Sequence, residues 1–413
     1  MNADLAVAAP LYRARDHNIF LACRFLSTIA MMVQSVAVGW QVYDIARDPL
    51  SLGLVGLSEF VPMFFLTLPA GDIVDRLDPR IVSALSLGAE AICGALLFGL
   101  AFAHLHVVWP FYCVMVLFGA ARGFSGPSGG SLLPFLVSPE VLPRAIAWSS
   151  SSFQVAVIAG PAIGGFLYAL GPQAAYALCF AAFLGAGVGM SLLGGRRNTA
   201  DRKHEMSALE RVAEGIAFVR QRPIILGAIS LDLFAVLLGG ATALLPVFAR
   251  DILHVGPIGL GVLRSATAVG AASMAFALAH SPLKRRAGIK MFGAVAIFGV
   301  GPIVFALSRN FYLTFAALAV LGASDMISVY VRSALIQFAT PDAMRGRVSA
   351  VNMLFIGASN ELGEFESGVT ASWFGTVPAV VLGGIGTLLV VAIWMALFPP
   401  LRNVDHLQDA AAA

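Results

Sequence analysis

Single charged residues interrupt several long apolar stretches of this 413-residue chain. Glu59, Glu90, Arg122, Asp232 and Asp325 each lie within such a stretch. A carboxylate in an apolar environment can exchange a proton as a ligand binds or leaves, and a guanidinium there can hold an anion. These five residues are therefore the candidates for ligand binding and for proton exchange.

The same residues have an alternative interpretation, in which charges of opposite sign pair permanently and fix how two helices pack. A charge on the lipid face of a membrane-spanning helix costs about 3 kcal/mol at mid-depth. Charges inside apolar stretches must therefore face the protein interior, a cavity or an interface. They are Arg24, Glu59, Glu90, Arg122, Asp232, Arg264, Asp325, Arg332, Glu361, Glu364 and Glu366.

The composition identifies the elements that must position these charges. Hydrophobic residues make up 59% of the chain and charged residues 12%, whereas about a quarter of a soluble domain is charged. The apolar runs of about 20 residues or more lack strand alternation, which predicts membrane-spanning helices and not a barrel. Twelve spans are predicted, near residues 18–45, 51–71, 80–103, 108–136, 143–168, 173–193, 223–248, 256–280, 288–308, 311–339, 347–373 and 377–398.

The basic residues predict the orientation in the membrane. Of the 26 Lys and Arg residues, 19 lie in segments on one side of the predicted spans, three on the other side and four within spans. Because cytoplasmic segments carry the excess of Lys and Arg, both termini are predicted to be cytoplasmic. The net charge of +3 is thus a topology signal and does not indicate nucleic-acid binding. The N-terminal segment lacks the pattern of a cleaved signal peptide, so we expect the first span to be retained.

One long polar segment divides the chain into halves. Within it, Leu209, Val212, Ile216 and Val219 lie at helical spacing, which predicts an amphipathic helix on the inner membrane surface. The predicted domains are an N-terminal six-helix bundle at 1–193, a cytoplasmic amphipathic linker at 194–222, and a C-terminal six-helix bundle with a short cytoplasmic tail at 223–413.

The two halves are related by an internal repeat with a constant offset of 203 residues. Ala46-Arg47-Asp48 aligns with Ala249-Arg250-Asp251, and Gly119-Ala120 aligns with Gly322-Ala323. The predicted fold is all-α, with twelve transmembrane helices in two pseudo-symmetric six-helix bundles of the same orientation. This parallel-repeat arrangement is that of major facilitator transporters, which expose a site between the halves to each face of the membrane in turn.

The same offset aligns Arg122 with Asp325, so the repeat places a cation and a carboxylate at equivalent positions of two helices. In the major facilitator superfamily these helices line the central cavity. We therefore expect Arg122 and Asp325, together with Asp232 on the seventh helix, to form the polar part of that cavity. Glu59 and Glu90 are further candidates for the proton-exchanging carboxylate.

Three short motifs carry a family resemblance. Residues 71–80, GDIVDRLDPR, resemble the major facilitator signature G-x-x-x-D-R-x-G, with Asp78 in place of the last Gly. Gly160-Pro161-Ala162-Ile163-Gly164-Gly165 is similar to the G-P-x-x-G-G of many exporters, and Arg122-Gly123-Phe124-Ser125-Gly126 to their R-x-x-Q-G. Longer stretches at 35–71, 345–368 and 377–391 resemble the enterobactin-exporter-like, or transmembrane secretion effector, branch.

The resemblance implies roles for two of these motifs. Gly71, Asp75, Arg76 and Arg80 form the cytoplasmic gate in this interpretation, with Arg144 or Arg347 as a partner of Asp75. Gly71 lets its helix approach a neighbour, and the arginines hold carboxylates or helix C-terminal carbonyls. The alternative is that these charges only mark topology.

The small residues Gly160, Pro161, Gly164 and Gly165 form a hinge in the fifth helix, because proline removes a backbone hydrogen bond and glycines leave a flat face. The alternative for this helix is close packing alone.

The function predicted from these features is secondary, proton-coupled export of a small amphipathic organic molecule, siderophore-like or drug-like, across a bacterial inner membrane. Uptake of a small nutrient by the same fold is the alternative. An enzyme or sensor is disfavoured because the loops are short and gather no catalytic group. No phosphate-binding G-x-x-x-x-G-K-[ST] occurs, and the four cysteines and few histidines suggest neither a metal nor another cofactor. The expected partners are the small-molecule substrate, protons and the lipid bilayer, and no nucleic acid.

Overall fold

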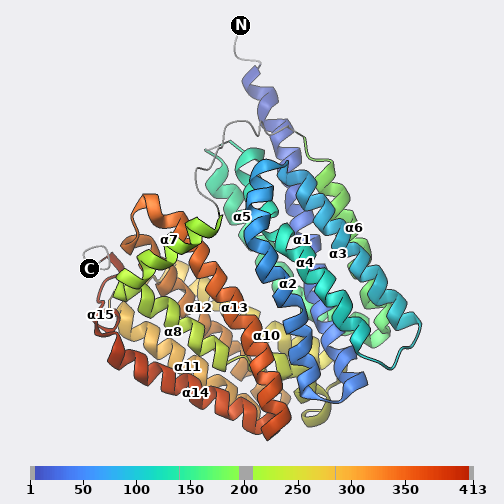
Figure 1. The fold of residues 1–413 in the computed structure, drawn as a ribbon, viewed down its shortest axis with the longest axis vertical. Helices are drawn as coiled ribbons and strands as arrows, with labels where there is room; N and C mark the ends of the chain where they lie inside the picture. Colours follow the sequence, from blue (N-terminus) through green and yellow to red (C-terminus); the bar gives the residue numbers. More distant parts are fainter. Residues whose placement is uncertain (1–4, 139, 195–207, 284, 409–413) are drawn as a thin grey trace. The chain divides into compact units, whose positions relative to one another are not determined.

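The computed structural model describes the backbone of residues 5–138, 140–194, 208–283 and 285–408. It describes their side chains except at positions 5–14, 68, 72, 75, 76, 208 and 343. In the described residues the secondary structure is helical (Figure 1).

The helices before the polar segment are α1 (Leu5–Ala46), α2 (Pro49–Arg76), α3 (Pro79–Phe102), α4 (Trp109–Leu136), α5 (Leu142–Leu170) and α6 (Pro172–Ser191). Proline lies in the first turn of α3, α4, α5 and α6, where its missing N–H leaves no hydrogen bond unmade. Asp78 caps α3 by accepting a hydrogen bond from the backbone N–H of Arg80. Gly171, with a φ of 143°, makes the tight connection from α5 to α6.

The later helices are α7 (Ala208–Gln221), α8 (Pro223–Leu238), η2 (Ala241–Leu244), α9 (Leu245–Val247), η3 (Phe248–Ile252), α10 (Gly256–His280), α11 (Ala287–Leu307), α12 (Phe311–Ala339), α13 (Asp342–Phe374), α14 (Thr376–Leu397) and α15 (Pro399–Arg402). Asn310 caps α12 by accepting from the N–H groups of Tyr312 and Leu313.

Ten helices or helical runs of the described residues are long and apolar enough to cross a membrane. The run from Pro223 to Ile252 counts as one of them and includes α8, η2, α9 and η3. α4 and α13 are not among the ten, although they contain 28 and 33 residues. α4 is rich in Gly and Ser, and α13 carries several glutamates in its middle.

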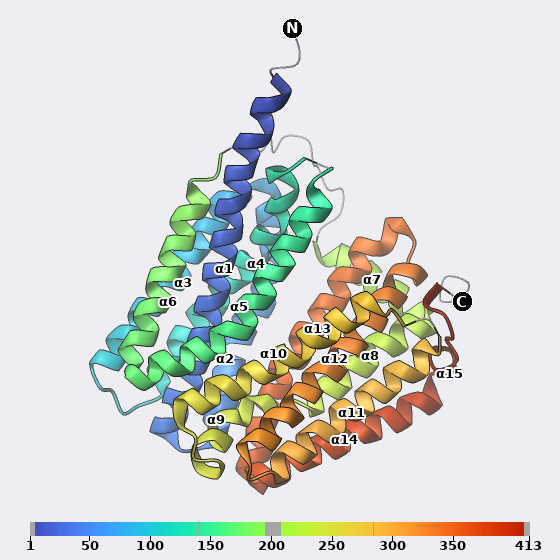
Figure 2. The same cartoon turned by 180° about the vertical axis from the view of Figure 1, so that it is seen from behind.

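The chain splits into two compact units. Unit 1 comprises Met1–Gln41 and Ser58–Ala208, and unit 2 comprises Val42–Leu57 and Leu209–Ala413. The end of α1 and the start of α2 therefore pack within unit 2, while the rest of both helices belongs to unit 1. Figures 1 and 2 show α3 beside α6 in unit 1, and α11 beside α14 in unit 2.

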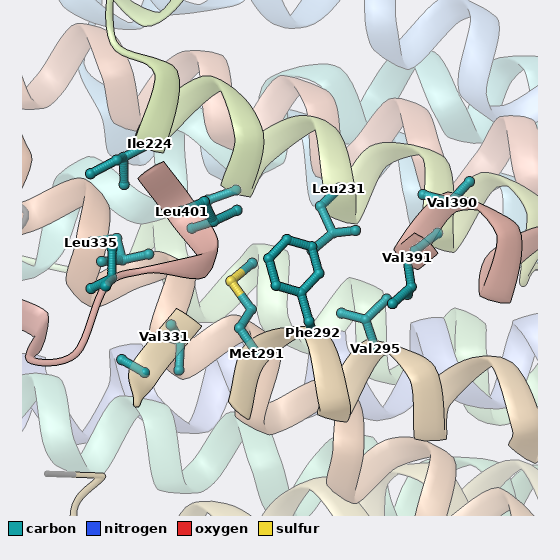
Figure 3. Close-up of a cluster of buried hydrophobic side chains, with 14 residues drawn as sticks. Ile224, Leu231, Met291, Phe292, Val295, Val331, Leu335, Val390, Val391 and Leu401 are labelled. Carbon is teal, nitrogen blue, oxygen red and sulfur yellow. The ribbon is translucent and has the colours of Figure 1, made fainter. Parts of the chain in front are cut away.

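The core of unit 2 is a continuous apolar cluster between α8, α11, α12 and α14 (Figure 3). Leu231, Met291 and Phe292 lie near its centre and are fully buried or nearly so. Such interdigitated side chains hold membrane helices together by van der Waals contact, since lipid offers no hydrophobic driving force between helices. The core holds α8 and α12 side by side, which positions the charges that these two helices carry.

The amphipathic helix α7 packs its apolar face on unit 2. Val212, Ile216 and Val219 lie against an apolar cluster from α8, α12 and α13, whereas Leu209 is exposed. A Cβ at Gly215 would contact the backbone carbonyl of Arg347 in α13, so the two helices touch closely. The amphipathic pattern is thus explained by packing on α8, α12 and α13, and the location of the helix at the inner membrane surface remains a prediction.

The C-terminal segment is attached to the connection between α10 and α11. The N–H of Ala287 donates to the carbonyl oxygen of Asp405 at 3.1 Å. The Asp405 carboxylate accepts a hydrogen bond from the N–H of Arg286 at 2.8 Å. This bond, helped by the nearby Arg285 guanidinium, holds the pKa of Asp405 below its ordinary value.

Candidate functional site

The crossing of α2 and α4 in unit 1 is very close. A Cβ at Gly119 would meet the backbone carbonyl of Glu59, and a Cβ at Gly123 would lie 3.1 Å from the Leu66 Cβ. These glycines form a G-x-x-x-G pattern on α4, which lets two membrane helices approach closely. The crossing brings side chains 63 positions apart in the sequence into contact.

Four polar side chains meet at this crossing, and we call them the acid–arginine cluster: Glu59, Glu90, Arg122 and Ser125. The guanidinium of Arg122 on α4 pairs with the carboxylate of Glu59 on α2. The hydroxyl of Ser125, also on α4, donates to Oε1 of Glu90 on α3 at 2.7 Å. Glu90 is 4% exposed, whereas the side chains of Arg122 and Glu59 are 28% and 14% exposed.

The two carboxylates of the cluster have different surroundings. Glu59 has a counter-ion, but none of the described basic groups lies within ion-pair distance of Glu90. A hydroxyl can donate to an ionised carboxylate and can also accept from a protonated one. Ser125 can therefore keep its hydrogen bond in both protonation states of Glu90, so the cluster can gain or lose a proton without losing that contact.

Replacing Gly119 with Leu tests the crossing. We expect the larger side chain to push α2 and α4 apart, to cost about 1–3 kcal/mol or more of stability through overpacking, and to separate Arg122 from Glu59. Thermal unfolding of the purified protein in detergent measures the loss. Gly126→Leu on the same helix is the control, because nothing lies within 4 Å of a Cβ at Gly126. An equal effect of both substitutions would contradict this account of the crossing.

Asp232, expected in a wet cavity, forms a buried ion pair in unit 2. Its carboxylate on α8 pairs with Arg332 on α12, and the two side chains are 7% and 2% exposed. Their sequence neighbours Leu231 and Val331 belong to the apolar core of unit 2. The pair agrees with the alternative interpretation, a permanent contact between two helices, and a cavity role for Asp232 remains a prediction.

Arg122 and Asp325, which the repeat aligns, lie in different units. Arg122 has Glu59 as its partner in unit 1. Asp325 on α12 is partly exposed, and within the described part of the chain it makes no ion pair or side-chain hydrogen bond. Asp325 thus remains a second candidate for proton exchange.

The predicted gate motif at 71–80 is only partly described. The side chains of Asp75 and Arg76 lie outside the described residues. None of the described atoms lies within 4 Å of a Cβ at Gly71, so none of the described helices packs closely there. Arg80 pairs with Asp78 and donates to the backbone carbonyl of Leu193, just beyond α6, at 2.6 Å. A carbonyl at a helix C-terminus was one of the two partners expected for Arg80.

The predicted loop partners of Asp75 have other surroundings. Arg347 pairs with Glu214 of α7 at 2.7 Å, so it ties the N-terminal end of α13 to α7. Arg144, in the first turn of α5, is exposed.

The small-residue motif of α5 packs against α1 within unit 1. A Cβ at Gly160 would meet the side chain of Met32, and a Cβ at Gly164 would lie 3.0 Å from the Cα of Val33. Gly160, Pro161, Gly164 and Gly165 are all buried. α5 continues as one helix through Pro161. The motif therefore makes a close helix contact here, and a hinge motion remains a prediction.

A charged cluster that was not singled out joins the end of α1 to η3 within unit 2. Arg250 pairs with Asp44, Arg47 pairs with Asp251 at 3.8 Å, and the Tyr43 hydroxyl donates to the Asp251 carboxylate. Arg47 and Arg250 are repeat equivalents, so the two copies of the Arg-Asp dipeptide face each other. The duplicated dipeptide marked these loops in the sequence, but it did not indicate that Arg250 pairs with Asp44 or Arg47 with Asp251.

A break in the seventh membrane-spanning run was also missed. α8 ends at Leu238, and the chain turns at Gly239 and Gly240 before it becomes helical again. A Cβ at Gly240 would meet the backbone of Gly363 in α13, so glycine is required at this crossing. The Gly-Gly dipeptide in the middle of an apolar run was the signal for the break.

Apolar helices with charges buried at their crossings, arranged in two units, define a membrane transporter rather than an enzyme. Among the described residues, no group of three or more His, Cys, Asp or Glu side chains could hold a metal ion. The comparison with solved structures supports the fold. A nucleoside transporter, NupG, has a TM-score of 0.67 at 16% identity and covers 93% of this chain and 99% of its own. A bacterial homologue of the iron transporter ferroportin has a TM-score of 0.68 at 17% identity, over 95% of this chain and 99% of that one.

The family is identified by sequence. The profile of the transmembrane secretion effector family matches residues 6–413, and the chain belongs to this family. The enterobactin exporter EntS of Citrobacter koseri is 27% identical over 98% of this chain and 95% of its own length. The predicted family resemblance is thus confirmed. The chain is a multi-pass transporter of the bacterial inner membrane and has no enzymatic role.

Proposed function

We propose that this transporter is a secondary exporter, which moves a small amphipathic organic molecule out of the cytoplasm in exchange for protons by alternating access. The direction is supported by the relatives, which are named enterobactin exporters. A siderophore-like or drug-like cargo agrees with apolar helices that carry only a few charges.

The observation that carries the proton coupling is the environment of Glu90. Its carboxylate is buried, accepts a hydrogen bond from one hydroxyl and lacks a counter-ion among the described residues, while the neighbouring Glu59 is paired with Arg122. An ionised carboxylate without a partner is strongly disfavoured in such a site, so proton uptake and release there are linked to what surrounds it. In this proposal, the distance between the Arg122 guanidinium and the Glu90 carboxylate controls whether Glu90 holds or releases its proton. Asp325 is the competing proton carrier.

We further propose twelve transmembrane helices with both termini in the cytoplasm. α4 and α13 would provide the two additional spans, since both are long enough at about 1.5 Å per residue to cross a bilayer of roughly 30 Å. The excess of basic residues on one side supports the orientation. The repeat supports two bundles at 1–193 and 223–413, joined by the linker at 194–222.

Two motifs are assigned to the conformational change. Gly71, Asp75, Arg76 and Arg80 form the cytoplasmic gate, and the free space beside Gly71 leaves room for a helix to approach. Residues 160–165 of α5 provide the hinge, because Pro161 interrupts the backbone hydrogen bonding of a helix that is closely packed on α1.

Transport into everted membrane vesicles tests the function. Vesicles that contain the protein and are acidified inside are expected to accumulate enterobactin, and a protonophore is expected to abolish the accumulation. Vesicles from cells without the protein are the control. Accumulation in right-side-out vesicles instead would show uptake, and accumulation that is unaffected by the protonophore would remove proton coupling from the proposal.

A further inference from the structure

α1 has three different faces along its length in unit 1. α5 covers the face of Met32 and Val33, and α6 covers the face of Cys23, whose sulfur would meet a Cβ at Gly189. Near the N-terminal end, Ala22 and Leu26 are exposed on the side that α5 covers further along. Apolar residues exposed on a membrane helix are typical of a lipid-facing side.

The third face of α1 is polar and faces away from Ala22 and Leu26. Arg24, Ser27, Met31 and Ser35 follow at helical spacing, and none of them is buried. Ser35 is exposed although Gln34 and Val36 beside it are fully covered. Because residues two positions apart lie on nearly opposite sides of a helix, this stripe cannot share the lipid-facing side of Ala22 and Leu26.

Arg24 is the charged residue of this polar face. Its guanidinium lies over the ring of the buried Phe20, 5.9 Å from the centroid, and this contact orients it. Among the residues that the structure describes, no carboxylate pairs with Arg24. The hydroxyls of Ser27 and Thr28 donate to the backbone carbonyl of Arg24 at 3.1 and 2.8 Å, and among the described residues the guanidinium makes no side-chain hydrogen bond.

We propose that Arg24 binds an oxygen anion of the cargo, a carboxylate or an ionised phenol, on the polar face of α1. The charges support this occupant. The other described arginine of unit 1 within the apolar part of the helices, Arg122, already has Glu59 as a counter-ion. An unpaired guanidinium in partly desolvated surroundings is a strong site for a planar anion, because it offers several N–H donors in a fixed geometry. The inference rests on the proposed function, since it names the chemical class of the exported molecule.

The cargo is a better occupant than a lipid phosphate because of where Arg24 points. A lipid headgroup would reach a basic residue on the lipid-facing side of α1, beside Ala22 and Leu26, whereas Arg24 lies on the opposite side. Arg15 is the basic residue on that lipid-facing side, at helical spacing with Ala22, and it is exposed. Arg15 therefore provides a matched control for a headgroup contact.

The experiment uses a pair of probes that differ only in the anion. N-dansyl-leucine carries a carboxylate, and its methyl ester is neutral. The full-length protein in nanodiscs of phosphatidylcholine is titrated with each probe, and binding is followed by fluorescence polarisation. We expect the wild-type protein to bind the carboxylate roughly tenfold or more tightly than the ester, as for one charge-assisted hydrogen bond in a desolvated site.

Three variants test whether Arg24 causes the preference for the carboxylate probe. Arg24→Gln is expected to abolish the preference while ester binding remains, Arg24→Lys is expected to keep part of it, and Arg15→Gln is expected to leave it unchanged. Ester binding by each variant shows that the variant is folded. Equal affinities of the wild-type protein for both probes, or a preference that survives in Arg24→Gln, would overturn the proposal.

A lipid role is measured separately. If Arg24→Gln releases bound phosphatidylglycerol in native mass spectrometry and leaves the carboxylate preference intact, Arg24 is a headgroup contact and the proposal is wrong. The binding measurement needs no proton gradient. A failure of proton-driven export in vesicles would therefore remove the proposed function without deciding whether Arg24 recognises an anion.

Discussion

Replacing Glu90 with Gln is expected to abolish proton-driven accumulation of the cargo in everted vesicles. A gradient of about 2 pH units can support roughly a 100-fold accumulation at one proton per molecule, because each unit is worth about 1.36 kcal/mol. Glutamine keeps the shape of Glu90 and the hydrogen bond to Ser125, but it cannot release a proton. The accumulation ratio should fall towards one, while exchange of labelled for unlabelled cargo without a gradient should continue.

Two further substitutions show which carboxylate carries the proton. Asp325→Asn removes the competing carboxylate and is expected to leave the accumulation ratio near that of the wild-type protein. Glu90→Asp retains an ionisable group on α3 and is expected to restore part of the coupling. Unchanged accumulation in Glu90→Gln, together with a loss in Asp325→Asn, would move the proton site to α12.

Replacing Arg332 with Met is expected to destabilise the protein by about 3–5 kcal/mol, because it leaves the Asp232 carboxylate buried without a partner. The change conserves most of the side-chain volume, so the loss reports the uncompensated charge and not a cavity. Thermal unfolding in detergent measures it, as a large decrease of the midpoint temperature.

The double variant Asp232→Leu with Arg332→Met is the matched control. Replacement of a buried ion pair by apolar residues of similar size is often neutral or stabilising. We therefore expect the double variant to regain most of the stability and to keep proton-driven export. A double variant that is stable but has lost coupled export would show that Asp232 takes part in transport, against the interpretation of a permanent pair.

The choice of Glu59, Glu90 and Arg122 as candidate residues did not need a structure. A charge within an apolar span is costly whichever partner it finds, so its presence alone indicates a buried contact or a functional site. The partners could not be predicted in the same way. Arg122 and Asp325 were expected to line the same cavity because the repeat aligns them. The contact of Arg122 with Glu59 instead depends on the rotation of α4 about its axis and on the close approach of α2 at Gly119.

The charged cluster between the end of α1 and η3 gives a second example. The duplicated Arg-Asp dipeptide was visible at a constant offset, and it was used only as a sign of the repeat. The structure shows that Arg250 pairs with Asp44 and Arg47 with Asp251, within one unit. A repeat specifies which residues are equivalent, but it does not specify which of them are neighbours.

The amino-acid sequence by itself determined the membrane class and the family, since these depend on the length and polarity of local segments and on motifs a few residues long. It also showed which charges lie within apolar stretches, but not how deeply each of them is buried. Only the tertiary structure decided that Glu90 has no counter-ion among the described residues, that Asp232 pairs with Arg332, and that Arg24 lies on the side of α1 opposite Ala22 and Leu26. The physical reason is that ion pairs and burial depend on helix rotation and crossing distance, which small residues far apart in the chain set jointly.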